Sequence, residues 1–561
     1  MGKTGNVPGE ARKYKYLRED FPELPVKIEH LTIRLDFRDA HVEAENLLQM
    51  RASIPLDTLT LDAKELDVGS VEWLDGPDAD GVPLEFDYVK DRDKLFVKLP
   101  RRLEPGERLF VRTRNRCTPT EQMLEGIYRD TTPEGAPQQY ISQCQQWGFQ
   151  RIMPIFDDCR AKCTMTTTIE ADAAYTHLIS NGNVKKETNP AGVPVPKPGD
   201  SGRKVITYEN QVPMAPYLFF VAAGTWDSLV DEVRYPSGKK VRLEYLVPPG
   251  CAKEAAVPME ILKQSVLWVG RTQDYEYDFD TYRTICMNKS NFGGMENLGN
   301  TTIVTDAALI TEHTLDHLLL YAHAVIVHEF EHNQCGSATT MATPFDVWLN
   351  EAYTVDVERQ FMAGLFDAAF VRLHQVDSIR APLLGPLTIE DAGHYGRIVR
   401  EGFNDPEELI DGVTYVKAAE VIRMLRLVIG EEAFIAGKRL YFSRYLGGNA
   451  NTDQFFDCFE ETSGRSLERF KSEWLYRIGY PKVTATTAYD AASGRFIARF
   501  RQDPGQGKPP FVLPVSMSLV DSSGRDIDGT QRVVVLDGIE GEAVFEGLKA
   551  KPAFASMNRD S

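Results

Sequence analysis

Hydrophobic and polar residues alternate along the first 228 residues of the chain. The segments "VKIEHLTIRLDF" (26–37) and "RLFVRTRNR" (108–116) have the two-residue period of half-buried strands. The Pro- and Gly-rich "NPAGVPVPKPGDSG" (189–202) indicates a long hairpin tip. The stretch "YLFFVAAGTWDSL" (217–229) is interpreted as the last strand before a boundary. The pattern therefore predicts an N-terminal β domain.

The pattern changes after this point. From 229 to 480, segments such as "VPMEILKQSVLWVGRTQ" (257–273) and "AAEVIRMLRLVIGEEAFIAGKRLYFSRYL" (418–446) repeat apolar residues every three or four positions, which is typical of helices. From 481 to 561 the strand alternation returns, as in "GRFIARFR" (494–501), with turn sequences between the strands. We expect three domains: a β domain over 1–228, a helical domain over 229–480 and a small antiparallel sandwich over 481–561.

A candidate metal site lies in "AVIVHEFEHNQCG" (324–336). Residues i and i+4 of a helix share one face, so His328 and His332 can reach one ion. Glu329, one position round, can interact with a water on that ion without being a ligand. A match to H-E-x-x-H arises by chance in roughly one such chain in a hundred, so a third ligand is needed. Glu351, separated from His332 by eighteen residues and beside an apolar stretch, is the candidate. The alternative is a solvated glutamate on a surface helix.

Two further motifs accompany this site. "NFGGMENLGN" (291–300) and "TYVKAAEVIRML" (414–425) stand before and after it in the chain. The three motifs resemble the H-E-x-x-H-(eighteen residues)-E, G-x-M-E-N and Y-x-K-G-A motifs of the M1 aminopeptidases, or gluzincins. The resemblance covers nearly the whole chain and is closest to the bacterial alanyl aminopeptidase (aminopeptidase N) branch. It implies a multidomain α+β fold with an N-terminal β-saddle, a thermolysin-like catalytic domain and a C-terminal β-sandwich.

The resemblance also implies the roles of individual residues. His328, His332 and Glu351 would bind one Zn²⁺ per chain, and Glu329 would act as the general base. Tyr415 matches the tyrosine that donates to the oxyanion, although an ordinary aromatic at the start of a helix is the alternative. Among the implied substrate-binding residues, Glu296 binds the α-ammonium group and Phe292 lies beside the first side-chain pocket. The others are Gly293, Gly294, Met295 and Asn297 of the same motif, and Gln143 and Gln145.

Composition narrows the class of partner and the location. The net charge of −19 argues against a nucleic-acid partner, since phosphate binding needs a basic surface. No apolar run is long enough to cross a membrane, and the N-terminus has no apolar signal segment. Eight scattered cysteines favour reduced thiols in a cytoplasmic protein, with a metal site at Cys144, Cys159 and Cys163 as a minor alternative. A monomer is the default expectation, with the oligomeric state left open.

Three functions compete at this point. The favoured one is a zinc aminopeptidase that acts on peptides with a free N-terminus. The second is an epoxide hydrolase of the leukotriene hydrolase type, and the third is a catalytically silent scaffold protein. Related alanyl aminopeptidases continue with a helical domain where this chain stops, so we expect a more open cleft. The presence of all three ligands and of Glu329 favours the enzyme over the scaffold.

Overall fold

The computed structural model describes residues 12–381, 385, 388 and 396–559. The chain divides into two compact units. One unit contains Phe21–Pro344 and Tyr445–Asn449, and the other contains Met1–Asp20, Phe345–Arg444 and Ala450–Ser561. The boundaries expected near residues 228 and 480 remain a prediction.

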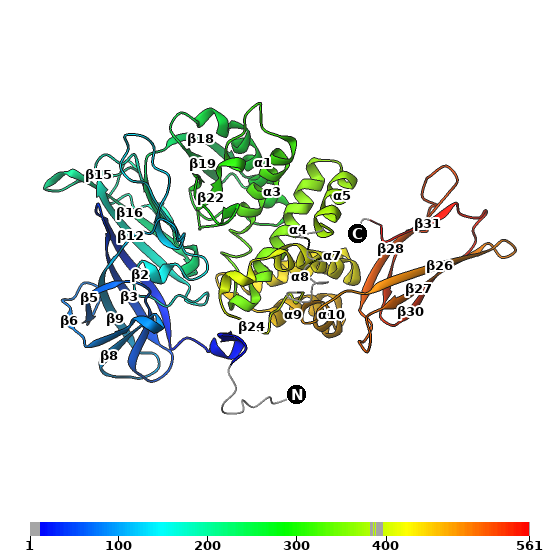
Figure 1. Ribbon diagram of the computed structural model, residues 1–561, viewed down its shortest axis with the longest axis horizontal. Helices are drawn as coiled ribbons and strands as arrows, with labels where there is room; N and C mark the ends of the chain where they lie inside the picture. Colours follow the sequence, from blue (N-terminus) through cyan, green and yellow to red (C-terminus); the bar gives the residue numbers. More distant parts are fainter. Residues whose placement is uncertain (1–11, 382–384, 386–387, 389–395, 560–561) are drawn as a thin grey trace. The chain divides into compact units, whose positions relative to one another are not determined.

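The first part of the Phe21–Pro344 unit consists of antiparallel and mixed β-sheets (Figure 1). Its largest sheet has nine strands in the order β14-β16-β12-β2-β3-β9-β5-β6, with β15 also paired to β16. These strands are β2 (Val26–Phe37), β3 (Val42–Ala52), β5 (Asp67–Leu74), β6 (Val82–Pro83), β9 (Arg108–Cys117), β12 (Cys163–Asp172), β14 (Asn183–Val184), β15 (Val195–Lys197) and β16 (Asp200–Met214). Leu31, Ile33 and Leu35 of β2 are buried, as the alternation predicts. The β15–β16 hairpin confirms the predicted tip.

Two smaller sheets complete this part. One is β10-β11-β17-β13 and the other is β4-β8-β7. Their strands are β4 (Leu56–Asp62), β7 (Phe86–Val89), β8 (Lys94–Leu103), β10 (Gly126–Arg129), β11 (Tyr140–Gln143), β13 (His177–Ser180) and β17 (Val221–Gly224). The single strand predicted over 217–229 is wrong. The chain forms β17, turns at the buried Trp226 and starts β18 (Asp227–Arg234) in a different sheet.

The rest of this unit combines a five-stranded sheet with helices. The sheet order is β18-β19-β20-β22-β21, and the short edge strand β21 (Gly294–Met295) runs antiparallel to β22 (Asn300–Val304). The other elements are β19 (Lys240–Val247), β20 (Thr281–Met287), α1 (Ala256–Thr272), α2 (Thr305–Ala308), α3 (Asp316–Glu331) and β23 (Thr340–Met341), which pairs with β25 (Asn449–Ala450). Helix α3 packs against α1, α2 and β21.

The second unit contains most of the helices. They are α4 (Val347–Leu365), α5 (Ala368–Ile379), α7 (Ala418–Ile429), α8 (Glu431–Arg444), α9 (Thr452–Ser463) and α10 (Glu468–Leu475), with a small pair β1 (Tyr16–Leu17) and β24 (Gly402–Phe403). The helical run predicted over 418–446 is two helices. Gly430 separates them with φ 89° and ψ 154°, a backbone conformation that only glycine adopts readily.

The same unit ends in the predicted antiparallel sandwich. One sheet is β26 (Lys482–Asp490), β27 (Arg495–Asp503) and β30 (Glu540–Phe545). The other is β29 (Arg532–Leu536), β28 (Leu513–Val520) and β31 (Phe554–Met557). Phe496, Phe500, Leu519 and Phe545 fill the space between them. The fold therefore has the predicted order: a β-rich N-terminal part, a helical part and a C-terminal β domain.

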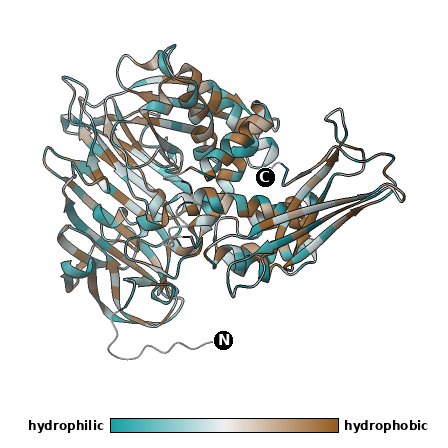
Figure 2. Ribbon diagram, turned by 45° about the vertical axis from the view of Figure 1, so that its right-hand side comes forward, coloured by the Kyte–Doolittle hydropathy of each residue, from teal (hydrophilic) through white to brown (hydrophobic). Residues whose placement is uncertain are grey.

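Apolar residues are spread through all these parts. Figure 2 shows hydrophobic and hydrophilic segments alternating along many of the strands. Among the described residues, no helix has both the length and the hydrophobicity that crossing a bilayer requires. All eight cysteines are free thiols, and seven of them are buried.

Candidate metal centre

The last turns of α3 place two histidines in a buried position. The apolar residues Val325, Ile326 and Val327 anchor this end of the helix in the interior. His328 lies in the last turn and His332 directly follows the helix as its C-cap. They are 8% and 1% exposed, so neither imidazole is an ordinary surface group.

Hydrogen bonding orients the ring of His332. Its Nδ1 lies 2.8 Å from the backbone carbonyl oxygen of Cys335. A carbonyl oxygen can only accept, so Nδ1 carries the proton and Nε2 keeps a lone pair. The Nε2 atoms of His332 and His328 are 3.0 Å apart, and the two rings are nearly perpendicular at 81°. The lone pair of His332 therefore points to the place where His328 also presents a ring nitrogen.

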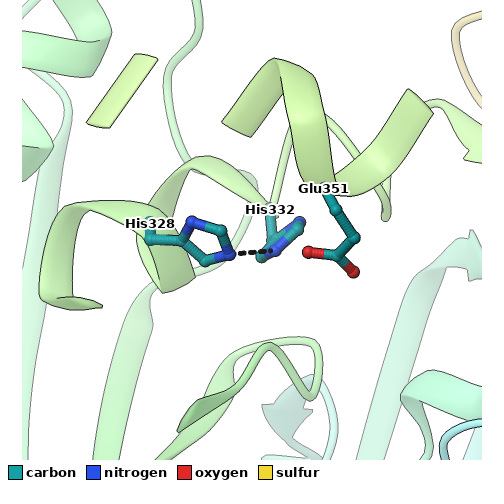
Figure 3. A group of neighbouring side chains, drawn as sticks. All are labelled: His328, His332 and Glu351. Atoms are coloured by element: carbon teal, nitrogen blue, oxygen red, sulfur yellow. Dashed lines mark hydrogen bonds between the residues drawn. The ribbon is translucent and has the colours of Figure 1, made fainter. Parts of the chain in front are cut away.

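Glu351 contributes a carboxylate to the same place (Figure 3). It is 1% exposed on α4, where every residue from Val347 to Val357 is buried. One ligand atom from each of His328, His332 and Glu351 lies within 4.8 Å of the other two. Two neutral imidazoles and one carboxylate are a donor set that suits a four-coordinate zinc ion with one position open. The arrangement therefore fits the metal that the sequence predicted, and the solvated-glutamate alternative is wrong.

The cysteine alternative finds no such support. Among the residues that the structure describes, this is the one group of three or more His, Cys, Asp or Glu side chains close enough to hold an ion. Cys144, Cys159 and Cys163 are buried, and burial raises the pKa of the Cys163 thiol and holds it in its neutral form.

Glu329 lies against the strand that carries the second motif. It is 5% exposed. A Cβ atom placed on Gly294 of β21 would lie 2.2 Å from Glu329 Oε1 and 2.5 Å from Cδ. Only a glycine lets the strand backbone pass this close to the carboxylate. The H-E-x-x-H and G-x-M-E-N motifs, about thirty residues apart in the chain, are thus in direct contact.

The rest of the second motif follows β21. Met295 is buried and pairs with Thr302 of β22. Asn297 donates from Nδ2 to Thr302 Oγ1 at 3.5 Å, and Glu296 is 6% exposed. Phe292 is half-buried, with its backbone N–H donating to Ser290 Oγ at 2.9 Å.

Gly293 and the glutamine pair complete the predicted substrate-binding set. A Cβ atom on Gly293 would lie 1.8 Å from the hydroxyl of Tyr321, so α3 covers this glycine as well. Gln143 at the end of β11 and Gln145 beyond it are both buried, and Gln143 Nε2 donates to the backbone oxygen of Gln145 at 3.5 Å.

Tyr415 lies in a single π-helical turn, Val413–Lys417, that leads into α7 and packs against α4. Its ring is half-buried, and its backbone N–H donates to the carbonyl oxygen of Asp411 at 3.1 Å. Two residues on, Lys417 donates from Nζ to the backbone oxygen of Gly396 at 2.9 Å. Burial lowers the pKa of Lys417 to about 7.

Lys162 is a residue that no sequence pattern singles out. Its Nζ lies 2.8–3.2 Å from four oxygens, namely Ser337 O, Ala338 O, Thr340 Oγ1 and Gly448 O. The first of these belongs to the loop that follows His332, and the Ser337 N–H donates back to the His332 carbonyl at 2.9 Å. Lys162 therefore fixes the loop that orients the second histidine. A lone lysine carries no spacing pattern, so only the structure reveals it.

Known families match the chain in three consecutive segments. The descriptions are "Peptidase M1 N-terminal domain" over residues 14–218, "Peptidase family M1 domain" over 257–474 and "Domain of unknown function (DUF3458) Ig-like fold" over 479–561.

Individual relatives agree with these families. An aminopeptidase N of Caulobacter vibrioides is 30% identical over 85% of this chain and 52% of its own length. An aminopeptidase N of Escherichia coli is 30% identical over 75% of this chain and 47% of its own length. The chain thus spans about half the length of these curated relatives.

A solved structure supports the fold. The crystal structure of Legionella pneumophila aminopeptidase A in complex with aspartic acid superposes with a TM-score of 0.83 at 23% identity, covering 97% of this chain and 60% of that chain. Two M1 domains match in sequence order, and the His-His-Glu cluster lies in the segments that the second of them covers. The chain belongs to the M1 peptidase family.

Proposed function

We propose that this chain is a zinc-dependent aminopeptidase that removes the N-terminal residue from peptides. The observation that carries the proposal is the buried convergence of His328, His332 and Glu351 next to Glu329. A donor set of this kind supports hydrolysis when a general base stands beside it. The relatives named aminopeptidase N add to this support.

Three residues would hold the zinc ion, and the second histidine is already prepared for this role. His332 has its tautomer fixed by the Cys335 carbonyl, so Nε2 is the ring nitrogen that presents a lone pair toward the ion. When bound, zinc supplies Lewis-acid chemistry, which polarises a scissile carbonyl and lowers the pKa of water toward neutrality.

Glu329 is assigned the proton transfers. Its carboxylate would accept a proton from the attacking water and pass it to the leaving amine. The contact with Gly294 gives this carboxylate a fixed place beside β21. Tyr415 is assigned the donor to the carbonyl oxygen as that oxygen gains negative charge.

Glu296 is assigned the recognition of the substrate N-terminus. Its carboxylate is 6% exposed, so it gains more from an ammonium partner than a solvated carboxylate would. A fixed contact to the α-ammonium group sets the cut one residue into the peptide. We assign Gln143 and Gln145 to the amine and side-chain pockets and Phe292 to the border of the first side-chain pocket. Gly293 and Gly294 would let the backbone approach the peptide closely, and Met295 and Asn297 complete the substrate-binding segment.

The expected substrates are peptides with a free N-terminus. We also propose a cytoplasmic location, supported by the eight free thiols, because disulfides are rare in that reducing compartment.

The test is hydrolysis of aminoacyl-naphthylamides by the purified chain, with its zinc content measured by elemental analysis. We expect one zinc per chain, release from unblocked substrates and no release from N-acetylated ones. Glu329→Gln should keep the zinc and lose turnover by at least about 10²-fold, since the base is gone and the ligands remain. Zinc binding without turnover of any substrate would contradict the proposal and favour a scaffold.

Glu296→Gln separates recognition from chemistry. It should raise KM for unblocked substrates and leave the zinc content unchanged, because the amide keeps the shape and loses the charge. An unchanged KM would remove Glu296 from its assigned role.

A further inference from the structure

Strand β26 is an edge strand that is exposed on both faces. Of its nine residues, Lys482 to Asp490, eight are exposed and Tyr489 is half-buried. It pairs with β27 along its whole length, from Lys482 opposite Asp503 to Asp490 opposite Arg495. Within the described part of the chain, no strand pairs with its outer side (Figure 1).

The outer side of β26 lacks the usual protection of an edge. Natural edge strands are shielded by interior charges, prolines, bulges or short length. The seven residues from Val483 to Tyr489 contain no charge, proline or glycine, and the register with β27 has no shift. Valine, threonine and tyrosine are also residues that favour a strand. This edge is therefore ready to accept another strand.

The sequence of β26 is complementary to itself. In an antiparallel pair of two copies centred on Thr486, Lys482 of one copy faces Asp490 of the other, at both ends of the strand. Val483 then faces Tyr489, and Thr486 faces its own counterpart. Opposite charges and an aliphatic–aromatic pair are stabilising when they lie directly across from each other.

Asp490 is ionised and can be the negatively charged partner of Lys482 in this pair. Its Oδ2 accepts from Ser493 Oγ at 2.6 Å and its Oδ1 from the Ala492 N–H at 3.0 Å. These hydrogen bonds, the one from Ser493 foremost, lower the pKa of Asp490.

We propose that β26 is a homotypic docking edge, through which two copies of this chain pair antiparallel about a two-fold axis at Thr486. The two three-stranded sheets then join into one continuous sheet in the order β30-β27-β26-β26-β27-β30. The axis makes the interface isologous, so each contact occurs twice. Because one strand pair buries less than the roughly 1,000 Å² of a stable interface, the dimer forms and dissociates with concentration. The strand thus gives a reason for association where the sequence alone suggested a monomer.

The test uses the one position that faces itself. Thr486 is exposed in the monomer and pairs with Arg499 of β27, so urea midpoints must check that Thr486→Lys and Thr486→Glu keep the fold. In the dimer, each variant places like charges directly opposite each other. Sedimentation equilibrium of the full chain should show a monomer–dimer equilibrium. Each variant should weaken it by at least about tenfold. An equimolar mixture of the two variants should restore it, because lysine then faces glutamate.

A matched control places the same charge elsewhere. Ser522→Lys adds a lysine at an exposed turn of the same domain and should associate like the parent chain. Equal urea midpoints for all variants show that folding is intact. A parent chain that stays monomeric at every concentration overturns the proposal, and so does a dimer that neither charge weakens or that the mixture fails to restore. The result does not depend on peptidase activity.

Discussion

Lys417 is a lysine whose ammonium group is almost entirely shielded from water. It is 6% exposed, it donates to the Gly396 carbonyl, and burial lowers its pKa to about 7. In the unfolded chain its pKa is about 10.4. Below pH 7 both states are protonated, and the cost of burying the charge is fully present. Between pH 7 and about 10 the unfolded chain binds more protons than the native one, so stability rises with pH.

We therefore predict that Lys417 makes the protein more stable in mild alkali. From pH 7 to pH 9 this group should add about 2 kcal/mol to the free energy of unfolding. The measurement is urea unfolding at the two pH values for the parent and for Lys417→Met. The free energy of unfolding of the variant should not rise by this amount between the two pH values. The hydrogen bond that the variant loses lowers its stability equally at both. An equal pH dependence in both proteins would show that Lys417 keeps its charge when folded.

Gly294 is the residue that controls the position of the proposed base. Gly294→Ala puts a Cβ atom within 2.2 Å of Glu329 Oε1, so the carboxylate must move. A displacement of about 1 Å at a catalytic group costs about 10²-fold in rate. We expect kcat on aminoacyl-naphthylamides to fall by that factor while zinc content stays unchanged, because the substitution displaces the base and leaves all three proposed ligands in the chain.

The matched control is Gly76→Ala, where a Cβ atom meets nothing within 4 Å. Its activity should equal that of the parent. Full activity of Gly294→Ala would mean that Glu329 can act from a second position.

At the element scale, sequence periodicity predicts which segments are helices and strands but not where they stop. The run 418–446 is apolar at helical spacing throughout, and this spacing alone does not show where one helix ends and the next begins. The break comes from the backbone of Gly430, and one glycine within a helical pattern does not distinguish a tolerated residue from a stop. The strand predicted over 217–229 failed for a similar reason, because burial of Trp226 redirects the chain between two sheets.

The junction between α7 and α8 yields a prediction about stability. At φ 89° and ψ 154°, Gly430 occupies a region in which a side chain is strained, even though nothing lies within 4 Å of its would-be Cβ. Gly430→Ala should therefore lower the free energy of unfolding by about 1–3 kcal/mol through backbone strain alone. Urea denaturation measures it, with Gly76→Ala as the unstrained comparison. A neutral result would show that the α7–α8 junction relaxes to another turn.

At the scale of the whole molecule, local motifs predicted much of the candidate site and tertiary contacts supplied the rest. The pair His328 and His332 follows from helix geometry, and Glu351 follows from the demand for a third ligand. The approach of Gly294 to Glu329 and the oxygens around Lys162 join segments far apart in the chain. The sequence pattern also does not predict that Tyr445–Asn449 belongs to the same unit as Phe21–Pro344.

The three proposed ligands lie on two different helices, and this arrangement determines how zinc should affect stability. Two of the proposed ligands come from the end of α3 and one from α4, so the complete set exists only when both helices are folded. An ion that binds the native state alone stabilises it by about 2.7 kcal/mol at a free concentration of 100 times Kd. Spread over all 561 residues of the chain, that corresponds to about 2 °C in the unfolding midpoint.

We therefore expect chelator-treated protein to unfold at a lower temperature and to recover its midpoint when zinc is added. Differential scanning calorimetry measures both steps. His332→Ala removes one ligand, so zinc should leave its midpoint where it is. If zinc raised the midpoint of His332→Ala as much as that of the parent, the stabilising ion would bind elsewhere on the chain. If it raised neither, α3 and α4 would not form a native-state zinc site. If zinc raises the midpoint of the parent but not that of His332→Ala, the stabilising ion binds at the three proposed ligands, which come together only when both helices are folded.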